Sequence, residues 1–577
     1  MAYSIENMEN TDTVYMVMTD RFFDGDPTNN GTPGAEYQPG NLHFYQGGDW
    51  AGLRRKLPYI KALGFSAVWM SPPQVNELYS RTGDEAGYHG YYTRDFNSPN
   101  PHFGTAEELQ ALLCEAERLG IKMILDVQLN HTADYLAYPS QQYDPPEYRP
   151  APPFDNPSWY HNTPNIWNFA DPQEAQNYSL GGLDDLAQEN PACWQALLDA
   201  YWKPEMGTGW FSYGFSGSRL DAVVEIPPEY LERFEKHTGK HSFGEAFTGS
   251  AEENATFQQY IWGMLDYPLY FQLHNALCRG EDWGGVSRLL QKDGLYRDPC
   301  CLFTFLDNHD RARFLTNCAD NVSLLHLALA LLYALRGIPV VYYGTEQHMA
   351  GDFRFTEQML NDTNREMMPA FSSENRTAAL LRRLNGIRRD LAAIFAQGTQ
   401  REMYFRPGDS VYAFRRDAVD GRYSLCIFNK SAAAQTRTVF TGEPGRVEYV
   451  DLLDTRQHYV SDGGELTLFL PAYAAILLSP EAAGEYVPAL PEKTRIVIHF
   501  DTGFGNRLTI RGDTAPLRWD FGQRCENKNA DTWVFETERP KDGELRFKVL
   551  LNDAVWERGE DHRAAVGRET HIFPSFW

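Results

Sequence analysis

The sequence is poor in cysteine, and its cysteines are not arranged in pairs. The eight cysteines are dispersed over 577 residues apart from the adjacent Cys300 and Cys301, and none has the spacing of zinc ligands. We therefore do not expect a disulfide-based fold, and the free thiols favour a reducing compartment.

Basic charge is also in short supply. The chain has 52 Lys and Arg against 78 Asp and Glu, which gives a net charge of −26. A field of this sign repels nucleic acid and anionic membranes, so we expect neither as a partner. A neutral or cationic partner is favoured instead, and the oligomeric state stays open.

No segment is apolar over the length that a bilayer requires. The longest apolar run, residues 324–335, is interrupted by His326 and predicts a buried helix. Residues 1–12 are polar and acidic, without the basic and apolar regions of a signal peptide. As written, the sequence predicts a cytoplasmic protein; the alternative is a secreted protein whose signal has been removed.

What is present is a regular alternation of strand-like and helix-like segments. Amphipathic stretches such as 53–63, 106–119 and 229–236 separate short runs rich in β-branched and aromatic residues. Those runs are 14–22, 65–70, 123–129, 218–224, 242–247, 302–306 and 338–343. Strand and helix repeated in this way predict a parallel sheet, and so many units predict a closed (β/α)8 TIM barrel.

Three further segments do not show this alternation of strands and helices. Residues 132–215 are rich in Pro, Tyr and Asn and too long for a loop, so we predict a subdomain inserted after strand 3. Alternating strands then predict antiparallel β-sandwiches, with 479–491 as a linker. The predicted domains are the barrel in two parts, the inserted subdomain and two β-sandwiches: 1–131 and 216–396, 132–215, 397–480, and 487–577.

Carboxylates follow several predicted barrel strands. Arg219 and Asp221 are two residues apart on a strand, so both project from one face. Alone they could be a structural ion pair. Glu245 and Asp310 end other strands, and three carboxylates in one pocket cannot all ionise cheaply. A protonated acid beside an ionised nucleophile is the pattern for cleaving a glycosidic bond.

Four motifs resemble the signature regions of the α-amylase family, glycoside hydrolase family 13. They are 126–131 (DVQLNH), 217–222 (GSRLDA), 244–247 (GEAF) and 305–310 (FLDNHD). The runs 19–25 (TDRFFDG), 47–50 (GGDW) and 88–92 (YHGYY) are most similar to the cyclodextrin glucanotransferase and maltogenic amylase branch. The resemblance covers about residues 12–480.

The resemblance implies a role for each matching residue. Asp221 would be the nucleophile, Glu245 the general acid/base and Asp310 the transition-state stabiliser. The implied substrate contacts are His89, Tyr91, His131, Arg219, Phe247 and His309. Among them Arg219 would orient Asp221, and Tyr91 would stack on the sugar.

A cluster of hard oxygen ligands near the N-terminus suits Ca²⁺. By themselves Asp24, Asp26, Asn29 and Asn30 could be a solvated turn. The resemblance completes a calcium site with Gly47 and Asp49.

A second family calcium site is matched by Asn130 and Asp185. Where relatives carry a His whose backbone carbonyl is a ligand, this chain has Glu225.

Some positions depart from the cyclising relatives. Val224 replaces an acceptor-side Lys, and Gly181 replaces the aromatic around which the glucan curls. Thr363 and Met367 replace an Asp and an Arg that hold the donor chain. These changes weaken the case for cyclisation, whereas Phe247 favours transfer over hydrolysis.

The last segment carries Trp519, Trp533 and Trp556. Sugars stack on exposed aromatic rings, although all three could be core residues. The segment resembles a family-20 starch-binding module, which implies a sugar site at Trp519, Lys548 and Trp556 and a core role for Trp533.

The sequence thus predicts a Ca²⁺-binding, retaining α-amylase that hydrolyses α-1,4 bonds by double displacement. Expected ligands are starch, maltooligosaccharides or cyclodextrins. The alternatives are a glucan transferase of the cyclodextrin glucanotransferase or maltogenic amylase type, and a non-catalytic glucan-binding protein.

Overall fold

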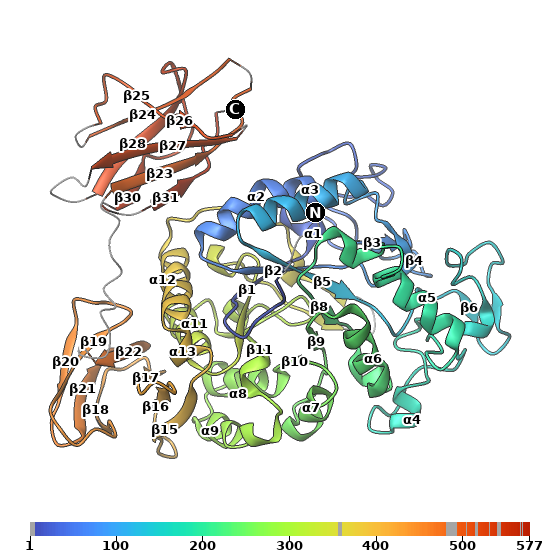
Figure 1. Ribbon diagram of the computed structural model, residues 1–577, viewed down its shortest axis with the longest axis horizontal. Helices are drawn as coiled ribbons and strands as arrows, with labels where there is room; N and C mark the ends of the chain where they lie inside the picture. Colours follow the sequence, from blue (N-terminus) through green and yellow to red (C-terminus); the bar gives the residue numbers. More distant parts are fainter. Residues whose placement is uncertain are drawn as a thin grey trace.

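Eight parallel strands close into a barrel, as predicted, in a computed structural model that describes most of the chain (Figure 1). The described residues are 6–355, 360–480, 493–503, 505–513, 517–529, 531–538, 544–565, 567 and 569–576. The barrel strands are β1 Val14–Val17, β2 Ala67–Met70, β5 Lys122–Val127, β8 Gly217–Leu220, β9 Ser242–Gly244, β10 Gly263–Leu265, β11 Leu302–Phe305 and β12 Ile338–Tyr342. Each strand pairs in parallel with its two neighbours, and β1 closes the ring against β12.

One barrel strand was absent from the prediction. β10 has only three residues and no β-branched run, so its sequence carries little strand signal. Register defines it instead: Gly263 pairs with Phe243 of β9, and Met264 pairs with Leu302 of β11. Gly263 is required there, since a Cβ would lie 2.6 Å from the Cys301 carbonyl oxygen.

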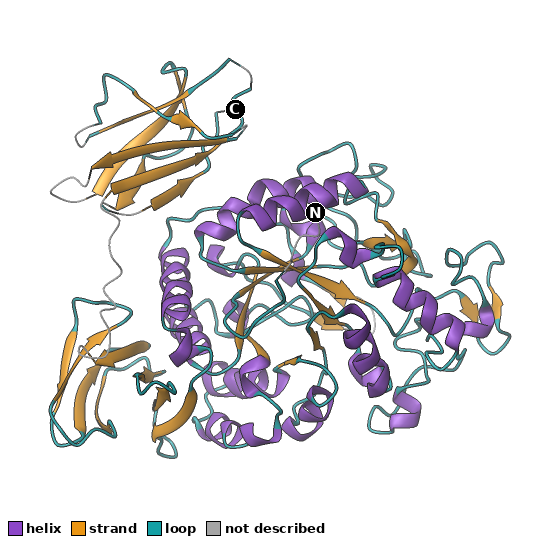
Figure 2. Ribbon diagram, viewed as in Figure 1, coloured by secondary structure: helices purple, strands orange, loops and turns teal. Residues whose placement is uncertain are grey.

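Helices surround the barrel (Figure 2). They are α1 Thr19–Phe22, α2 Trp50–Ala62, α3 Ala106–Arg118, α6 Pro228–Thr238, α7 Ala251–Gln258, α8 Tyr267–Cys278, α9 Gly284–Leu290, α10 Phe314–Asn317, α11 Val322–Ala334, α12 Arg376–Asp390 and α13 Ala392–Phe395. Local chemistry explains their starts. Thr105 and Glu108 form a capping box at α3, and Asp49 caps α2 by accepting from the Gly52 N–H. The predicted buried helix is α11.

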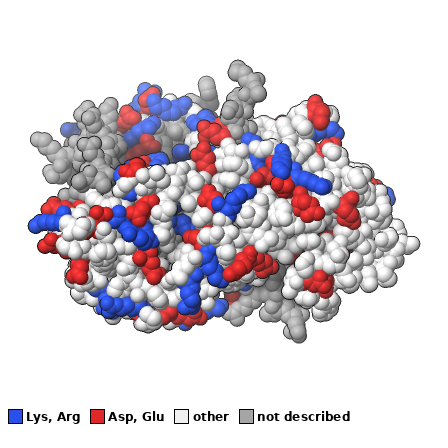
Figure 3. All heavy atoms as spheres, turned by 60° about the horizontal axis from the view of Figure 1, so that its bottom comes forward, with Lys and Arg blue, Asp and Glu red and all other residues white. Residues whose placement is uncertain are grey.

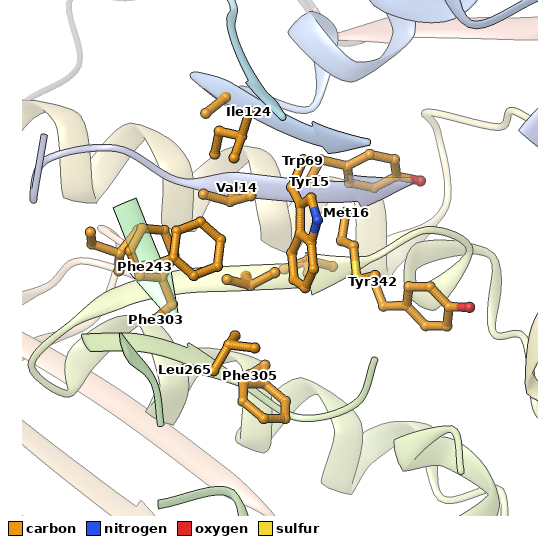
Figure 4. Packing of buried hydrophobic residues seen from close by; sticks show 14 of the residues in the cluster. Val14, Tyr15, Met16, Trp69, Ile124, Phe243, Leu265, Phe303, Phe305 and Tyr342 are labelled. Carbon is orange, nitrogen blue, oxygen red and sulfur yellow. The ribbon is translucent and has the colours of Figure 1, made fainter. Parts of the chain in front are cut away.

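Large side chains fill the barrel interior (Figure 4). Phe243 and Phe303 stack with ring centres 3.7 Å apart, and Trp69 meets Phe243 edge-on at 5.6 Å. All three are fully buried. Trp69 also donates its indole N–H to Asp126 at 2.9 Å. The packed core therefore reaches directly to the carboxylates at the end of the barrel.

The long connection between β5 and β8 contains little regular structure. Its elements are β6 Leu136–Ala137, β7 Gln142–Tyr143, η1 Pro157–Trp159, α4 Pro172–Ala175, α5 Pro191–Tyr201 and η2 Trp210–Tyr213. A second excursion follows β2, where β3 Gln74–Asn76 pairs with β4 Thr93–Pro99. The backbone N–H groups of Tyr135 and Leu136 both donate to Asp184, which ties the start of the connection to the segment just before α5.

An antiparallel domain follows the barrel. One sheet runs β15 Thr399–Tyr404, β16 Val411–Asp417, β17 Tyr423–Asn429, β22 Ala474–Pro480, β19 Val447–Asp451 and β20 His458–Ser461, and β18 Gln435–Phe440 pairs with β21 Glu465–Leu470. Tyr412, Phe414 and Phe428 belong to the same apolar cluster as the barrel core. This sheet therefore packs directly on the barrel helices.

The last domain is also a pair of sheets, with its own apolar core. One sheet runs β26 Glu526–Asn527, β27 Thr532–Glu538, β23 Lys493–His499 and β31 Glu569–Ile572; the other contains β25 Gln523–Arg524, β24 Leu508–Gly512, β28 Glu544–Leu551, β29 Val555–Trp556 and β30 His562–Ala565. With two β-sheet domains after the barrel, the predicted fold class is confirmed. The predicted domain boundaries stay predictions, and most of the predicted linker (481–491) lies outside the described residues.

Lys56 on α2 joins the barrel to the last domain. Its ammonium lies 4.1 Å from the Phe23 ring centre, 4.3 Å from Phe371 and 5.5 Å from Phe573. Burial lowers the pKa of Lys56 to about 8. Because Phe573 belongs to the last domain and the other two rings to the barrel, this cation–π cluster packs the two against each other.

On the face drawn in Figure 3, basic side chains alternate with acidic ones. Among the described helices, none combines the length and apolar character that crossing a bilayer requires.

Candidate active site

Arg219 at the end of β8 lies at the centre of the carboxylate cluster. It is fully buried. Its Nη1 donates to Asp126 at 2.9 Å and to Asp221 at 2.7 Å, and its Nη2 donates to Glu245. Parallel register places these residues together, since Arg219 pairs with Asp126 of β5 and Glu245 directly follows β9. One positive charge thus serves three carboxylates.

The carboxylates do not share one protonation state. Burial raises the pKa of Glu245 to about 7 and that of Asp221 to about 6, against the opposing effect of Arg219. Burial alone would raise the pKa of Asp310 as well, but its neighbours His309 and Arg365 hold it below its ordinary value, and near neutrality, where His309 is uncharged, the positive charge is that of Arg365. A proton near neutrality therefore resides on Glu245 in preference to Asp310.

Arg365 was missed by the sequence reasoning. It belongs to the short helix η7 Thr363–Arg365, and its Nη2 donates to Asp310 at 3.0 Å while its Nε donates to the His309 carbonyl at 2.9 Å. No motif surrounds it in the sequence, since its partners lie more than 50 residues away. Only the folded chain shows that it fixes Asp310.

Several of the predicted sugar-binding residues contact one another and this carboxylate cluster. Tyr91 donates to Asp126 at 2.9 Å and lies 2.9 Å from His309 Nε2. His89 stacks on Tyr91, and its Nδ1 accepts the Tyr91 N–H. His131 Nε2 lies 3.9 Å from Asp221.

The two strand-end histidines are neutral and each has a nitrogen with an unmet hydrogen bond. Burial lowers the pKa of His131 to about 4 and that of His309 to about 3. His131 Nε2 and His309 Nδ1 are buried without a hydrogen-bond partner. Buried polar atoms of this kind normally have partners, so the cleft offers hydrogen-bonding capacity to a neutral, hydroxyl-bearing ligand.

Tyr267 is a second contact that the sequence reasoning missed. Its hydroxyl donates to Glu245 Oε1 at 3.2 Å and accepts from the Asn308 amide at 3.0 Å. Its ring meets Phe247 edge-on at 5.0 Å, and Phe247 remains 57% exposed. Tyr267 therefore holds the acid/base candidate and supports an exposed aromatic ring beside it.

The departures from the family pattern have structural correlates. At Gly181 an added Cβ would meet no atom within 4 Å, so the space beside this residue is open. Among the described residues, no other side chain lies within that distance to take the place of the aromatic ring that the cyclising relatives carry there. Glu225 is buried, and burial raises its pKa to about 8. It is thus a further carboxyl group close to Asp221 and Glu245 whose charge is suppressed near neutrality.

The predicted calcium ligands near the N-terminus form one cluster. Asp24 Oδ1, Asn29 Oδ1 and Asn30 Oδ1 are all buried without a hydrogen-bond partner. The Asn30 amide donates to Asp24 at 2.8 Å, and the Asp49 carboxylate accepts from the Asp26 N–H at 2.7 Å. Orphaned oxygens of this type are what a hard cation requires, so this donor set fits Ca²⁺.

Two members of the cluster add detail. Asp26 Oδ1 accepts from both the backbone N–H and the hydroxyl of Thr28. Gly47 packs so closely on Asn30 that a Cβ would lie 2.7 Å from its amide nitrogen. No group of three or more His, Cys, Asp or Glu side chains forms a metal site in the described part of the chain, so the fit depends on amide oxygens.

At the second predicted calcium site three polar groups converge. The Asn130 amide lies 2.9 Å from the Glu225 carbonyl oxygen and 3.2 Å from Asp185 Oδ1. Asp185 also contacts His161 Nδ1 at 2.5 Å. In the structure the Asn130 Oδ1 faces these two oxygens, and only an amide turned over would direct an N–H at them. The converging oxygens suit a cation, but the turned amide would satisfy the same atoms, so this site is less specific than the first.

The last domain presents two exposed indole rings. Trp519 and Trp556 are 38% and 44% exposed, with ring centres 6.4 Å apart. Trp533 is 5% exposed and belongs to the core, as predicted. Lys548 is buried, and its ammonium donates to the Gly559 carbonyl at 2.6 Å. Lys548 thus ties down the loop that follows Trp556.

Comparison with known proteins bears on these observations. The family described as "Alpha amylase, catalytic domain" matches residues 16–380, and "Alpha amylase, C-terminal all-beta domain" matches 405–481. A Beta/alpha-amylase of Paenibacillus polymyxa is 31% identical to this chain. The match covers 74% of this chain and 34% of that protein, so the chain corresponds to about a third of this relative. A cyclomaltodextrin glucanotransferase of Geobacillus stearothermophilus is 30% identical over 87% of this chain and 71% of the relative. The solved structure of an Anoxybacillus alpha-amylase has a TM-score of 0.71 at 28% identity, covering 82% of this chain and 99% of the other.

The carboxyl pKa values predict a narrow, bell-shaped pH dependence of kcat/KM. On the roles that the resemblance implies for Asp221 and Glu245, activity should fall below about pH 6, where Asp221 is protonated, and above about pH 7, where Glu245 has lost its proton. The measurement is kcat/KM on maltoheptaose from about pH 4 to 9. Since Asp221 and Glu245 interact, the two apparent pKa values of the profile describe the pair and not either residue alone. Asp390→Asn, at a surface aspartate that pairs with Arg389, should retain both limbs; a flat profile would contradict the assignment.

Proposed function

The chain belongs to the α-amylase family, glycoside hydrolase family 13, and on that premise we propose that it is a retaining α-amylase acting on the α-1,4 bonds of starch and related glucans. The observation that carries the proposal is the contact of Asp221 and Glu245 with the same guanidinium of Arg219. A nucleophile and an acid held side by side suit double displacement.

In the proposed mechanism Glu245 and Asp221 act in two steps. Glu245, whose pKa is raised by burial, protonates the leaving oxygen while ionised Asp221 attacks the anomeric carbon. The glycosidic C–O bond breaks and a glycosyl ester of Asp221 forms. Deprotonated Glu245 then takes a proton from water, whose oxygen attacks the same carbon and releases Asp221.

The remaining cleft residues bind and stabilise. Asp310, kept ionised by His309 and Arg365, stabilises the positive charge of the oxocarbenium-like transition state. The unmet nitrogens of His131 and His309 bond hydroxyls of the sugar being cleaved. Tyr91, held by Asp126, packs on the apolar face of that sugar.

Hydrolysis is favoured over cyclisation by Gly181, which leaves open the space where cyclising relatives carry an aromatic ring. Transfer remains the alternative, supported by the exposed Phe247 and by the glucanotransferase relative. A non-catalytic glucan-binding role is disfavoured because Asp221, Glu245 and Asp310 are all present with their partners.

We assign starch adsorption to the last domain and calcium to the N-terminal cluster. Trp519 and Trp556 offer a stacking platform for starch, maltooligosaccharides or cyclodextrins. The cluster of Asp24, Asn29 and Asn30 with Gly47 and Asp49 would hold Ca²⁺, which would stabilise the loop before α2. We also propose the domain boundaries predicted from the sequence: 1–131 with 216–396 for the barrel, 132–215 for the inserted subdomain, and 397–480 and 487–577 for the two β-sandwiches.

The nucleophile assignment predicts that Asp221→Asn lowers kcat on soluble starch at least about a thousandfold, because the covalent step is lost. Adsorption to granular starch should survive, since it depends on the last domain. Asp390→Asn is the matched control. Near wild-type turnover by Asp221→Asn would refute the assignment.

In wild-type digests, NMR should show α-configured products at first appearance, and chromatography should show mainly linear ones; a dominant cyclic fraction would favour the transferase.

The calcium proposal predicts a higher melting temperature in Ca²⁺ than in EDTA. Saturation at a hundredfold the dissociation constant stabilises a protein by about 2.7 kcal/mol. Asn30→Ala removes a buried ligand candidate and should abolish the difference in melting temperature. Asn97→Ala, an exposed residue on β4, should keep it. Identical melting of the wild type in both buffers would exclude the site.

The starch-binding assignment predicts that Trp519→Ala or Trp556→Ala weakens adsorption to granular starch about tenfold, through loss of a stacking surface. Turnover of maltoheptaose should change less than about twofold. Phe440→Ala removes an exposed aromatic ring of the preceding domain and serves as the control. Unchanged adsorption in both tryptophan variants would move the starch site elsewhere.

A further inference from the structure

Arg311, the residue after Asp310, differs from the other arginines of the cleft. Arg219 and Arg365 pair with carboxylates, and Arg313 donates to the Asn364 and Tyr343 carbonyls. For Arg311, no carboxylate oxygen lies within 4 Å in the part of the chain that the structure describes. Its Nε is buried and has no hydrogen-bond partner. A buried donor without a partner is rare in folded proteins, so this guanidinium has bonding capacity to offer.

The guanidinium of Arg311 is held in place by aromatic rings. Its central carbon lies 4.9 Å from the Phe247 ring centre and 6.0 Å from that of Tyr270. Phe247 is itself supported by Phe271, whose ring centre is 5.9 Å away, and by Tyr267. Stacking of this kind orients a guanidinium while leaving its N–H groups free to bond in its plane.

The position of this stacked pair relates it to the leaving group. Phe247 follows Glu245 by two residues, and Tyr267 contacts both the Phe247 ring and the Glu245 carboxyl. Glu245 protonates the departing oxygen, so the departing sugar must lie next to Glu245. The exposed Phe247 ring and the guanidinium on it therefore border the space of the departing sugar. Val224, three residues after Asp221 in the chain, has no polar side chain to offer.

We propose that Arg311 is a specificity-determining residue for the sugar on the acceptor side, where it donates hydrogen bonds to hydroxyls of the departing glucosyl unit. By microscopic reversibility the same contacts hold an incoming acceptor sugar in transfer reactions. A guanidinium presents five donors in a planar fork and suits neighbouring sugar hydroxyls. The inference rests on the proposed function and adds a residue that none of the signature motifs assigns.

The test compares two donors that differ only in whether the leaving group occupies the acceptor side. The leaving group of maltohexaose is a sugar, which occupies the acceptor side. The leaving group of α-maltotriosyl fluoride is fluoride, which needs no sugar contact there. Arg311→Met should lower kcat/KM on maltohexaose about tenfold, the value of one hydrogen bond to a charged group. It should leave kcat/KM on the fluoride within about twofold of wild type.

Acceptor binding gives a second readout. With the fluoride as donor, the KM for maltose as acceptor should rise about tenfold in Arg311→Met. Arg311→Lys keeps the positive charge but not the fork, and should lie between Arg311→Met and wild type. Arg279→Met, on the exposed end of α8, is the matched control and should behave as wild type.

Three outcomes would overturn the inference. Equal losses on maltohexaose and on the fluoride would place Arg311 among the groups that act on the donor sugar. Unchanged kinetics on both substrates and an unchanged maltose KM would show that it makes no sugar contact. Full restoration by Arg311→Lys would attribute the effect to charge near Asp310 alone. Inactivity of the wild type on both donors would instead refute the proposed function itself, and the inference with it.

Discussion

The active-site end of the barrel depends on the burial of one guanidinium among three carboxylates. Arg219 contacts Asp126, Asp221 and Glu245, and no water-exposed surface is left to it. Without that charge each buried carboxylate would cost several kcal/mol, or take up a proton. With it, one charge is still shared among three groups, and burial raises the pKa of each of them, to about 7 for Glu245 and about 6 for Asp221. Of these last two, Glu245 therefore keeps its proton to the higher pH.

Around this charged centre the site suits the neutral, hydroxyl-bearing ligand that we propose. Burial keeps His131 and His309 uncharged, and each leaves a nitrogen without a partner. Arg311, next to Asp310, likewise has a buried Nε without a hydrogen-bond partner. Unsatisfied polar atoms destabilise a free protein, and a hydroxyl-rich substrate relieves that cost on binding. The same atoms that weaken the empty cleft therefore give it specificity.

The other domains are attached to the barrel by apolar and cation–π packing. Tyr412 and Phe414 continue the barrel's core into the next sheet, so those two units share one hydrophobic cluster. The last domain keeps a separate core and meets α2 through Lys56 and Phe573. The sugar platform that we propose at Trp519 and Trp556 is thus held by a domain with a core separate from that of the barrel, which suits adsorption to a polymer independent of cleavage.

By itself the sequence determined the (β/α)8 class and the candidate nucleophile, acid and stabiliser, because these depend on short motifs at strand ends, where local order in the chain sets position in space. It could not show β10, whose three residues become a strand only through pairing with both neighbours. Nor could it show Arg365, Tyr267 or the stack of Arg311 on Phe247. Those contacts join residues that are 20 to more than 60 positions apart, and only barrel closure and side-chain packing decide which of many such residues meet.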